Sequence, residues 1–427
     1  MSGPVIGYAG LTHLGICSGV GAASKGFDVV GFHNDADLVA AIDGGSLPVV
    51  EPDLDALFAA NRGRLTFSAD PASLAQCDIV YVAVDVPTDD DGASDLTPID
   101  TMIDTVTPHL KDDAILVILC QVPPGYSRGR ALTPDRLYYQ VETLIFGRAV
   151  ERATLPERFI IGCADPARPL PSSYRVFLEA FGCPLLPMRY ESAELAKIAI
   201  NCFLVASVST TNTLAEMCER VGADWAEIAP SLRLDARIGP KAYLTPGLGI
   251  SGGNLERDLA TVCRLAVAND SDAGVIESYR GNSAYAKEWT WRTLERAVLA
   301  KQKTPKIAVL GLAYKENTHS TKNSPSLALL AHLEGQDVAV YDPVVSSDIV
   351  PFAKGLSTSL DAAAAADVVL LVTPWPEFRE ISPPDLAEVM AGKTVIDPYG
   401  LLDGDAVAAA GLDHYTLGVP ARLIEGA

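Results

Sequence analysis

Short apolar runs alternate with segments of helical period over the first 120 residues. Four of these runs have the length of buried strands, at 5–9, 29–32, 79–84 and 114–119. Apolar runs of this length, separated by helical patterns, are typical of βαβ units that build a parallel sheet. The N-terminal part of the chain is therefore predicted to be a doubly wound α/β domain.

The pattern changes in the middle of the chain and then returns. Helical periodicity continues without a strand over 191–221, a second long helix is predicted over 278–301, and a loop rich in glycine and proline joins them. Further apolar runs predict strands at 306–310, 338–341, 368–373 and 395–397. The predicted fold class is α/β, with two Rossmann-like doubly wound domains, 1–190 and 304–427, joined by a central helical domain, 191–303.

Composition narrows the choice of partners. The formal net charge of −21 repels polyanions and anionic lipid, so neither nucleic acid nor a membrane is expected as a partner. No apolar run approaches the roughly 18 residues of a membrane span and no export signal is visible, so the expected location is the cytoplasm. The eight cysteines occur singly, without a metal-ligand spacing to the six histidines, so we expect reduced thiols and no metal site.

The first predicted strand runs into a glycine turn that opens a helix, Gly10-Leu11-Thr12-His13-Leu14-Gly15. In a dinucleotide fold the first glycine makes the turn, the second lets the backbone approach the pyrophosphate, and the third lets helix and strand pack closely. Thr12 stands at the second glycine position. We expect a cofactor site here, with Gly10, Thr12, His13, Leu14 and Gly15 as its residues.

The end of the second strand bears on the choice of cofactor. An acid about 20 residues after such a turn usually binds a ribose hydroxyl of NAD. Here the strand ends in Phe32-His33-Asn34-Asp35. Either Asp35, in a shifted register, is the acid that binds the ribose hydroxyl, or His33 stands in place of that acid. With His33 at this position, the site would tolerate the 2′-phosphate of NADP more readily. We expect NAD or NADP, with NAD favoured.

Eight segments follow one another in a fixed order along the chain. They are the turn at 10–15, Glu51-Pro52, Thr88, Pro123-Pro124-Gly125, Ala193 to Lys197 with Asn201, Arg237-Ile238-Gly239, 246–253, and Gly311 to Lys315. Together they resemble the UDP-glucose/GDP-mannose dehydrogenase family. The resemblance covers nearly the whole chain, and its specificity lies in the order and spacing of the segments.

That resemblance implies an N-terminal NAD-binding domain, a central helical dimerisation domain, and a C-terminal domain for the nucleotide of a nucleotide sugar. It therefore also implies a homodimer. The implied reaction is a four-electron oxidation of the sugar C6 alcohol to a carboxylate. In that chemistry a cysteine thiolate adds to the intermediate aldehyde, and a thioester is formed and hydrolysed.

The chain departs from the family at this cysteine. The family pattern is Gly-Gly-Ser-Cys-Phe-Pro-Lys-Asp, whereas residues 251–258 are Ser-Gly-Gly-Asn-Leu-Glu-Arg-Asp, with Asn254 at the cysteine position. An amide can form hydrogen bonds but cannot add to an aldehyde. Cys263 falls on the opposite face of a helix through Asn254, and Cys202 points away from Lys197, so we expect no substitute nucleophile.

Other positions that the resemblance implies for the chemistry are kept. Lys197 and Asn201 are four residues apart on one face of a helix, where an ammonium can stabilise an alkoxide and an amide can position water. Asp258 resembles the family's water-ordering aspartate, and Glu142 resembles its substrate-side glutamate. With Asn254 to hold the aldehyde or hydrate, these are the expected catalytic residues.

The chain retains some of the residues that the resemblance assigns to substrate and cofactor binding. Arg237 resembles the arginine that reaches the sugar nucleotide across the dimer, and the segment from Tyr243 to Gly249 resembles the loop that holds the base and ribose. Lys315 matches a substrate lysine. Thr88 and Lys322 are assigned to the cofactor, although Lys322 replaces an NAD-contacting arginine and loses its bidentate fork.

Three functions fit these residues, and we rank them in the following order. The first is an NAD(P)-dependent oxidoreductase of a nucleotide sugar, with a UDP-sugar favoured, that performs two-electron alcohol and aldehyde chemistry without a thioester or completes oxidation through an aldehyde hydrate. The second is a redox-neutral epimerase or isomerase that returns the hydride from a tightly held cofactor. The third is a catalytically silent homologue that binds a nucleotide sugar.

Overall fold

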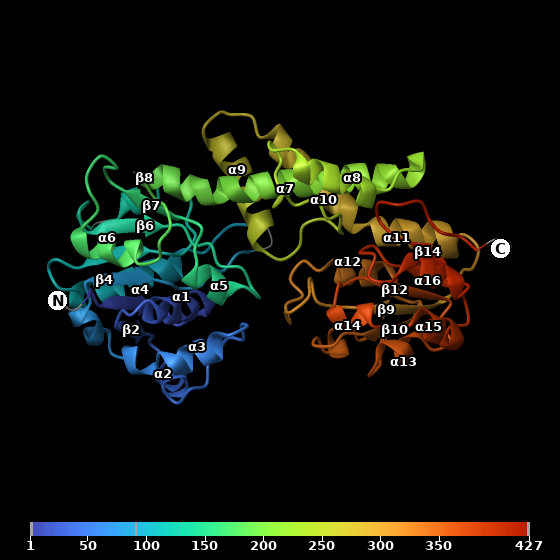
Figure 1. The fold of residues 1–427 in the computed structure, drawn as a ribbon, viewed down its shortest axis with the longest axis horizontal. Helices are drawn as coiled ribbons and strands as arrows, with labels where there is room; N and C mark the ends of the chain where they lie inside the picture. The colour runs from blue at the N-terminus through green and yellow to red at the C-terminus, as the bar shows by residue number, and fades with distance from the viewer. Residues whose placement is uncertain (1–2, 90–91, 131, 425–427) are drawn as a thin grey trace. The chain divides into compact units, whose positions relative to one another are not determined.

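The computed structural model describes residues 3–89, 92–130 and 132–424, and the chain divides into two compact units, residues 1–200 and 201–427. Each unit contains one sheet flanked by helices (Figure 1). Both sheets have the doubly wound strand order, so the predicted α/β fold class is confirmed.

The sheet of the first unit has the strand order β3-β2-β1-β4-β5-β6-β7-β8 among the described residues. Neighbouring strands are parallel, except that β6 and β7 are antiparallel. The strands are β1 (Ile6–Ala9), β2 (Val29–Phe32), β3 (Leu65–Ser68), β4 (Ile79–Val82), β5 (Ile115–Ile118), β6 (Leu137–Gln140), β7 (Phe159–Cys163) and β8 (Leu185–Arg189). The helices are α1 (His13–Ser24), α2 (Ala36–Asp43), α3 (Leu54–Ala60), α4 (Thr97–Val106), α5 (Ala149–Thr154) and α6 (Ser172–Glu179).

The central strands of this sheet carry no polar face. Every residue of β1, β2, β4 and β5 is buried. Helices on both faces of a parallel sheet bury its strands twice, which explains why these strands are continuous apolar runs in the sequence. The four strands predicted in this part of the chain are confirmed. The strand order reverses between β1 and β4, and doubly wound folds bind ligands at that switch point.

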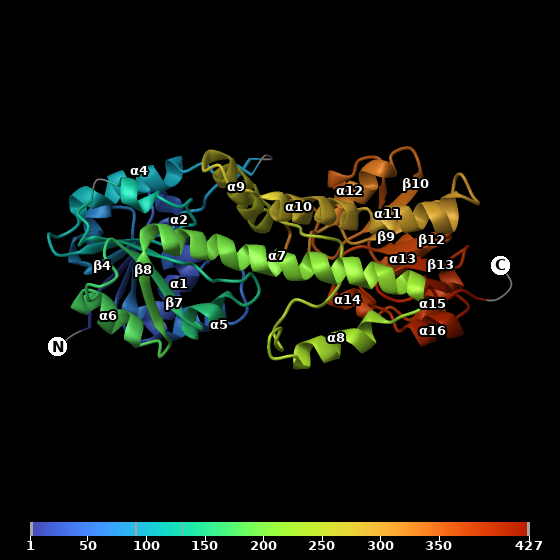
Figure 2. The same cartoon turned by 90° about the horizontal axis from the view of Figure 1, so that it is seen from above.

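Helix α7 (Tyr190–Val221) is one continuous helix of 32 residues (Figure 2), as the helical pattern over 191–221 predicts. With a mean hydropathy of 1.4 over 18 residues, it is the one helix of the described ranges long and apolar enough to cross a membrane. Its buried Asn201 and Asn212, however, form hydrogen bonds to Asp258 and Gly247 of the second unit. These polar contacts are those of a helix in a globular core.

The remaining helices of the central region are α8 (Trp225–Leu234), α9 (Asn254–Ala268), α10 (Gly274–Lys287) and α11 (Trp289–Leu294). The predicted helix at 278–301 is wrong in its extent, because helix starts at Gly274, breaks at Glu288, and ends in a π-helical turn at 295–299. The break directly precedes the buried Trp289, whose indole N–H donates to Glu219 of α7 at 2.9 Å. In Figure 2, α10 runs beside the C-terminal half of α7.

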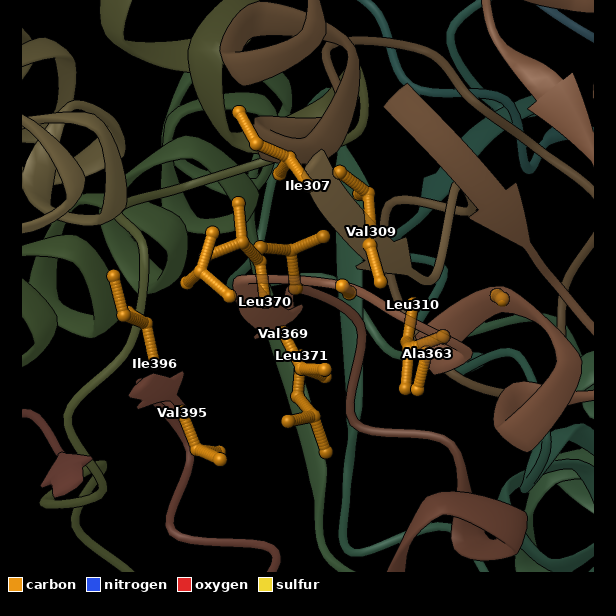
Figure 3. Close-up of a cluster of buried hydrophobic side chains, with 14 of the residues drawn as sticks. Ile307, Val309, Leu310, Ala363, Val369, Leu370, Leu371, Val395 and Ile396 are labelled. Carbon is orange, nitrogen blue, oxygen red and sulfur yellow. The ribbon is translucent and has the colours of Figure 1, made fainter. Parts of the chain in front are cut away.

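The sheet of the second unit is parallel throughout, with the order β11-β10-β9-β12-β13-β14 in the described residues. Its strands are β9 (Lys306–Leu310), β10 (Asp337–Tyr341), β11 (Lys354–Gly355), β12 (Val368–Leu371), β13 (Thr394–Ile396) and β14 (Asp413–Tyr415). Its helices are α12 (Pro325–His332), α13 (Ser359–Ala363), α14 (Pro376–Arg379), α15 (Pro383–Val389) and α16 (Gly404–Ala409). Side chains of β9, β12 and β13 form the centre of its core, as Figure 3 shows for Val309, Leu370 and Ile396.

Candidate functional site

The turn between β1 and α1 requires both of its glycines. Gly10 has φ +110°, and a Cβ on it would lie 2.5 Å from the carbonyl oxygen of Ala83. A Cβ on Gly15 would lie 1.9 Å from the carbonyl oxygen of Gly10, so only glycine allows the helix to start this close to the strand. The turn thus has the close strand-to-helix packing of a dinucleotide-binding fold.

Thr12 fits this turn without backbone strain. Its φ is −80°, and its hydroxyl donates to the Ala83 carbonyl at 2.9 Å. Although Thr12 is the N-cap residue of α1, its side chain does not bond to the first-turn amides. Those amides, with the positive end of a 12-residue helix, have the character of a phosphate-binding site.

His13 is held in place by a buried glutamate. Its Nε2 lies 2.8 Å from Oε1 of Glu51, and the Phe146 ring packs on the imidazole at a centroid distance of 4.3 Å. The same carboxylate accepts hydrogen bonds from the backbone N–H groups of Gly147 at 2.9 Å and Ala149 at 3.2 Å. Burial raises the pKa of Glu51, but these hydrogen bonds outweigh it and hold the pKa below its usual value. Glu51 therefore fastens the 146–149 segment beside the glycine turn.

The two candidate ribose-binding residues have different roles at the end of β2. Oδ1 of Asp35 accepts from the backbone N–H groups of Asp37 and Leu38, so this carboxylate caps α2. The backbone N–H of Asp35 donates to Nδ1 of His33 at 3.0 Å. A neutral His33 then carries its proton on Nε2 and offers a donor at the strand end.

Beyond β4, the structure identifies a carboxylate that the sequence analysis missed. Asp85 has an exposed side chain, but desolvation by the surrounding protein raises the pKa of its carboxyl, and the charge of His13 opposes that effect. Thr88, the residue predicted from this strand, forms an isolated bridge with Ser94, and its hydroxyl lies 3.5 Å from the Val86 carbonyl. The sequence feature that could have identified Asp85 is an acidic residue shortly after an apolar strand at the switch point of the sheet.

Lys197 and Glu142, both predicted as catalytic, are neighbours in the first unit. The ammonium of Lys197 donates to the backbone carbonyl of Glu142 at 3.0 Å, and lies 3.8 Å from its Oε2. Both side chains are mostly but not fully buried. The pair therefore combines a fixed positive charge with a carboxylate that solvent can still reach.

Glu194, in the same segment as Lys197, has a structural role. It is completely buried, and its carboxylate accepts from the N–H groups of Gly125 at 2.6 Å and Ser127 at 2.8 Å. Burial raises the pKa of Glu194, and these two hydrogen bonds oppose that effect. The Pro123-Pro124-Gly125 turn is thereby fastened to α7.

Asn201 and Asp258 form the polar centre of the second unit. Nδ2 of Asn201 donates to Oδ2 of Asp258 at 2.5 Å, and Nε of Arg257 lies 3.4 Å from Oδ1. All three side chains are buried. The structure thus brings together two residues 57 positions apart that the family resemblance implies for the chemistry, and both carboxylate oxygens of Asp258 have a protein partner.

Asn254 is the first residue of α9, and its side chain is exposed. It lies one helical turn before Asp258. The preceding Gly252 has φ +76°, and a Cβ there would lie 3.3 Å from the Tyr314 ring. A Cβ on Gly253 would contact the Lys322 side chain at 3.3–3.5 Å. Tyr314 and Lys322 therefore cover the loop that leads to Asn254.

Polar contacts lock the two loops together. The N–H of Gly252 donates to the Lys322 carbonyl at 3.1 Å, and Nδ2 of Asn323 lies 3.4 Å from the Gly252 carbonyl. Lys287 of α10 then donates to Asn323 at 2.5 Å and to Glu256 at 2.8 Å. The loop that leads into α9 and the first turn of α9 are consequently held by contacts with Lys322, Asn323 and Lys287.

The predicted substrate residues are distributed over this unit. Two features require glycine at position 249. Its φ is +71°, and a Cβ there would lie 2.5 Å from the Ser283 carbonyl oxygen. The ammonium of Lys315 lies 5.8 Å from the centre of the Tyr314 ring. Tyr243 has a half-exposed side chain, and its carbonyl accepts from Thr211. The exposed side chain of Arg237 pairs with Asp235 in its own loop, so it is not joined to the residues around Asn254.

The glycine turn after β9 differs from the first turn in its hydrogen bonding. Gly311 has φ +105°, but the N–H groups of Leu312 and Ala313 donate to Oδ2 of Asp342 at 2.6 and 3.0 Å. The indole N–H of Trp375 donates to the same oxygen. The backbone amides that follow this glycine are therefore paired with a carboxylate of the protein.

Burial raises the thiol pKa of three cysteines near the candidate residues. Burial raises the pKa of Cys202, which follows Asn201 on α7, to about 11. It raises the pKa of Cys17 and Cys120, near the first turn, to about 12. Thiols of this kind remain protonated at neutral pH and are poor nucleophiles.

Models of one protein family match most of the chain. Residues 5–170 match the NAD binding domain of the UDP-glucose/GDP-mannose dehydrogenase family, 191–283 match its central domain, and 308–404 match its UDP binding domain. The cofactor site at the first turn thus lies in an NAD-binding domain.

Whole-chain relatives and solved structures agree with this match. The chain is 30% identical to UDP-glucose 6-dehydrogenase of Rhizobium meliloti (strain 1021), over 96% of this chain and 98% of the relative. It is 29% identical to UDP-glucose 6-dehydrogenase TuaD of Bacillus subtilis (strain 168), over 97% and 93%. The fold is similar to that of UDP-D-ManNAc dehydrogenase from Pyrococcus horikoshii, with a TM-score of 0.83, 23% identity, and coverage of 97% and 99%. The chain belongs to the UDP-glucose/GDP-mannose dehydrogenase family.

Proposed function

We propose that this protein is an NAD-dependent oxidoreductase that converts a hydroxyl group of a nucleotide sugar, preferably a UDP-sugar, to an aldehyde without a thioester intermediate. The observation that carries the proposal is the polar centre at the start of α9. There the Asn201–Asp258 hydrogen bond is retained, while Asn254 stands one helical turn away at the position of the family's cysteine. Hydride transfer needs no thiol, whereas thioester formation does.

The first turn fits the cofactor. Gly10 and Gly15 allow the tight strand-to-helix junction, and the first-turn amides around Thr12, His13 and Leu14 would hold the pyrophosphate. His33, Asp35 and Thr88 are assigned to the rest of the dinucleotide. NAD is preferred over NADP, because the loop after β2 carries Asp35 and Asp37 and would repel a 2′-phosphate.

The catalytic roles follow from charge and hydrogen bonding. When bound, NAD supplies the acceptor for the hydride that leaves the substrate carbon. Lys197 stabilises the alkoxide that forms as the hydroxyl loses its proton, and Glu142 keeps the ammonium in place through its carbonyl. Asn201 and Asp258 order the water that takes the proton, and Asn254 holds the aldehyde through its amide.

Substrate binding is assigned to the second unit. Lys315 provides a cation for the diphosphate, and the segment from Tyr243 to Gly249 provides backbone groups for the base and ribose. Arg237 is assigned to a substrate bound by the partner in a homodimer. We further propose the three-domain division 1–190, 191–303 and 304–427, and a location in the cytoplasm.

The homodimer is proposed from the exposed face of α7. Phe203, Leu214, Met217 and Val221 are each at least 41% exposed. Their spacings of eleven, three and four residues place them on one helical face, as in helices that pack against each other. An apolar row of this kind is typical of a protein interface.

One assay tests the proposed reaction. The purified protein is incubated with UDP- and GDP-sugars and with NAD or NADP, while reduced cofactor and product mass are recorded. Reduced NAD together with a product two mass units lighter supports the proposal. A product of unchanged mass without net reduction would instead support the epimerase hypothesis. If calorimetry detects no binding of any nucleotide sugar, both are wrong.

A further inference from the structure

The imidazole of His13, the first residue of α1, has one ring nitrogen engaged by a carboxylate. Its Nε2 lies 2.8 Å from Oε1 of Glu51, and the side chain is 17% exposed, so a ligand can still reach it. Backbone N–H groups of Gly147 and Ala149 hold the pKa of Glu51 below its usual value, so this carboxyl is ionised at neutral pH. A carboxylate only accepts hydrogen bonds, so the proton between the two side chains belongs to Nε2 of His13.

The second ring nitrogen, Nδ1, has no hydrogen-bond partner in the part of the chain that the structure describes. Nδ1 is bonded to Cγ, so it is the ring nitrogen nearer to the main chain of His13. The N–H of that main chain is one of the first-turn amides of α1, which the Thr12 side chain does not cap. An unpaired ring nitrogen and a phosphate-binding amide thus belong to the same residue.

Carboxylates surround this imidazole. Glu51 contacts it from the loop before α3, and Asp85, after β4, interacts with it through its charge. A third carboxylate, Glu142, acts on Cys17, one helical turn further along α1. Negative charges around the ring favour its protonated form, and the charges of a bound pyrophosphate would favour it further.

The glycine turn and α1 supply no other cation. From Gly10 to Ser24, His13 is the one residue that can carry a positive charge. The 146–149 segment places the uncharged Phe146 ring on the imidazole, while its Arg148 pairs with Glu151. With its proton on Nε2, a neutral His13 has a lone pair on Nδ1, so a phosphate oxygen at that atom requires the protonated ring.

We infer that His13 binds the coenzyme pyrophosphate in its imidazolium form, with Nδ1–H donating to a phosphate oxygen while Glu51 holds Nε2–H. The inference rests on the coenzyme placement in the proposed function and adds a side-chain ligand to the first-turn amides. Binding of the dinucleotide then takes up a proton wherever the unbound His13 is neutral. The affinity for the coenzyme consequently depends on pH.

Calorimetric titration of the full-length protein with NAD tests this dependence. A histidine ordinarily loses its proton at about pH 6.5. The affinity for NAD should therefore fall about tenfold from pH 6 to pH 8.5, since one charge-assisted hydrogen bond is lost. At pH 7.5, titrations in two buffers of different ionisation enthalpy should show net proton uptake. ADP-ribose, which keeps the pyrophosphate and lacks the nicotinamide, should show the same dependence.

Three variants identify the group that titrates. His13→Gln keeps a donor for Glu51 but cannot be charged, so NAD should bind about tenfold more weakly than to the wild type at pH 6 and about equally at pH 8.5. His33→Gln removes the other histidine assigned to the coenzyme and should keep the dependence on pH. His332→Gln is the matched control and should behave as the wild type, because His332 also pairs with a glutamate, at 2.9 Å from Glu288, but lies in the second unit.

The opposite results are distinct. A wild-type affinity that is constant with pH and without proton uptake, or a dependence that persists in His13→Gln, overturns the inference and leaves the proposed function standing. So does a dependence seen with NAD and absent with ADP-ribose, because the contact would then lie at the nicotinamide. If neither NAD nor ADP-ribose binds at any pH, the coenzyme placement of the proposed function is wrong, and the inference falls with it.

Discussion

At the scale of single residues, the proposed reaction depends most on Asn254. It stands one turn before Asp258, whose oxygens are engaged by Asn201 and Arg257. In the proposed function, these polar residues surround an amide that cannot form a covalent intermediate. The proposed reaction therefore ends at the aldehyde.

Restoring the thiol should restore the second half of that reaction. In Asn254→Cys, we expect formation of the carboxylate, since a thiolate can add to the aldehyde and give an oxidisable thiohemiacetal. Mass spectrometry of the sugar product and the ratio of reduced cofactor to product measure this change. Asn254→Ser is the control, because a serine hydroxyl is a much weaker nucleophile. An aldehyde product from both variants would contradict the expected geometry.

Glu51 illustrates a residue whose importance is structural. Its Oε2 accepts from Ala149, while Oε1 accepts from Gly147 and contacts His13. In Glu51→Gln the amide NH₂ would face one of these N–H donors, so the free energy of unfolding should fall by about 2 kcal/mol at neutral pH. Urea denaturation of the variant and of the exposed neighbour Asp53→Asn measures the effect.

The pH dependence of this loss has a definite sign. The pKa of Glu51 is lowered by folding, so its stabilisation is present above the usual value of 4.5 and is lost as the pH falls through the folded value. The difference between wild type and Glu51→Gln should therefore shrink in acid. A difference that grows below pH 4.5 would contradict the assigned hydrogen bonds.

At the scale of helices and strands, the sequence predicts the buried elements well and the edges poorly. Strands such as β1 and β12 are continuous apolar runs because both of their faces are covered. The edge strands β11, with two residues, and β14, Asp413-His414-Tyr415, carry no such pattern. Propensity alone cannot recover a strand whose formation depends on the neighbour that it pairs with.

The candidate site shows the same limit. The spacing of Lys197 and Asn201 on one helix is evident from the sequence, and so is the glycine turn. The contact between Asn201 and Asp258, and the position of Lys322 over Gly253, depend on loops that pack from distant parts of the chain. Asp85 was missed because a single acid after a strand carries no periodic pattern.

A carboxylate joins three elements of the second unit. Glu219 of α7 accepts from the Trp289 indole of α11 and from the N–H of Gly418, which follows β14. Burial raises the pKa of Glu219 to about 7. Because the folded value lies above the usual 4.5, the associated stabilisation is complete at low pH and is lost as the pH rises through about 7.

In Glu219→Gln the side chain cannot ionise, so the loss of stability at rising pH should disappear. The amide oxygen can still accept the hydrogen bonds from Trp289 and Gly418. We expect the variant to exceed the wild type in unfolding free energy by about 1 kcal/mol at pH 8, after allowance for partial solvent screening, and to match it near pH 5. Thermal unfolding across this pH range measures the difference. Glu227→Gln, an exposed carboxylate on α8, should show no such trend, and a parallel trend in both variants would contradict the assignment.

At the scale of the whole molecule, the exposed row on α7 predicts the assembly state. Leu214→Glu combined with Met217→Glu places two charges within an apolar interface, so the proposed homodimer should dissociate to a monomer. Light scattering coupled to size-exclusion chromatography measures the mass of each species. Leu155→Glu changes a more exposed leucine of the first unit and should remain dimeric. A monomeric wild-type protein would contradict the proposed interface.

The two glycine turns have unequal capacities despite their shared fold. In the second, Asp342 already accepts from the amides of Leu312 and Ala313, and its negative charge opposes a phosphate at these two amides. A chain with two Rossmann-like sheets is therefore expected to take up a single equivalent of coenzyme. The first glycine turn keeps its helix amides for the coenzyme, whereas the second turn has its amides satisfied within the protein.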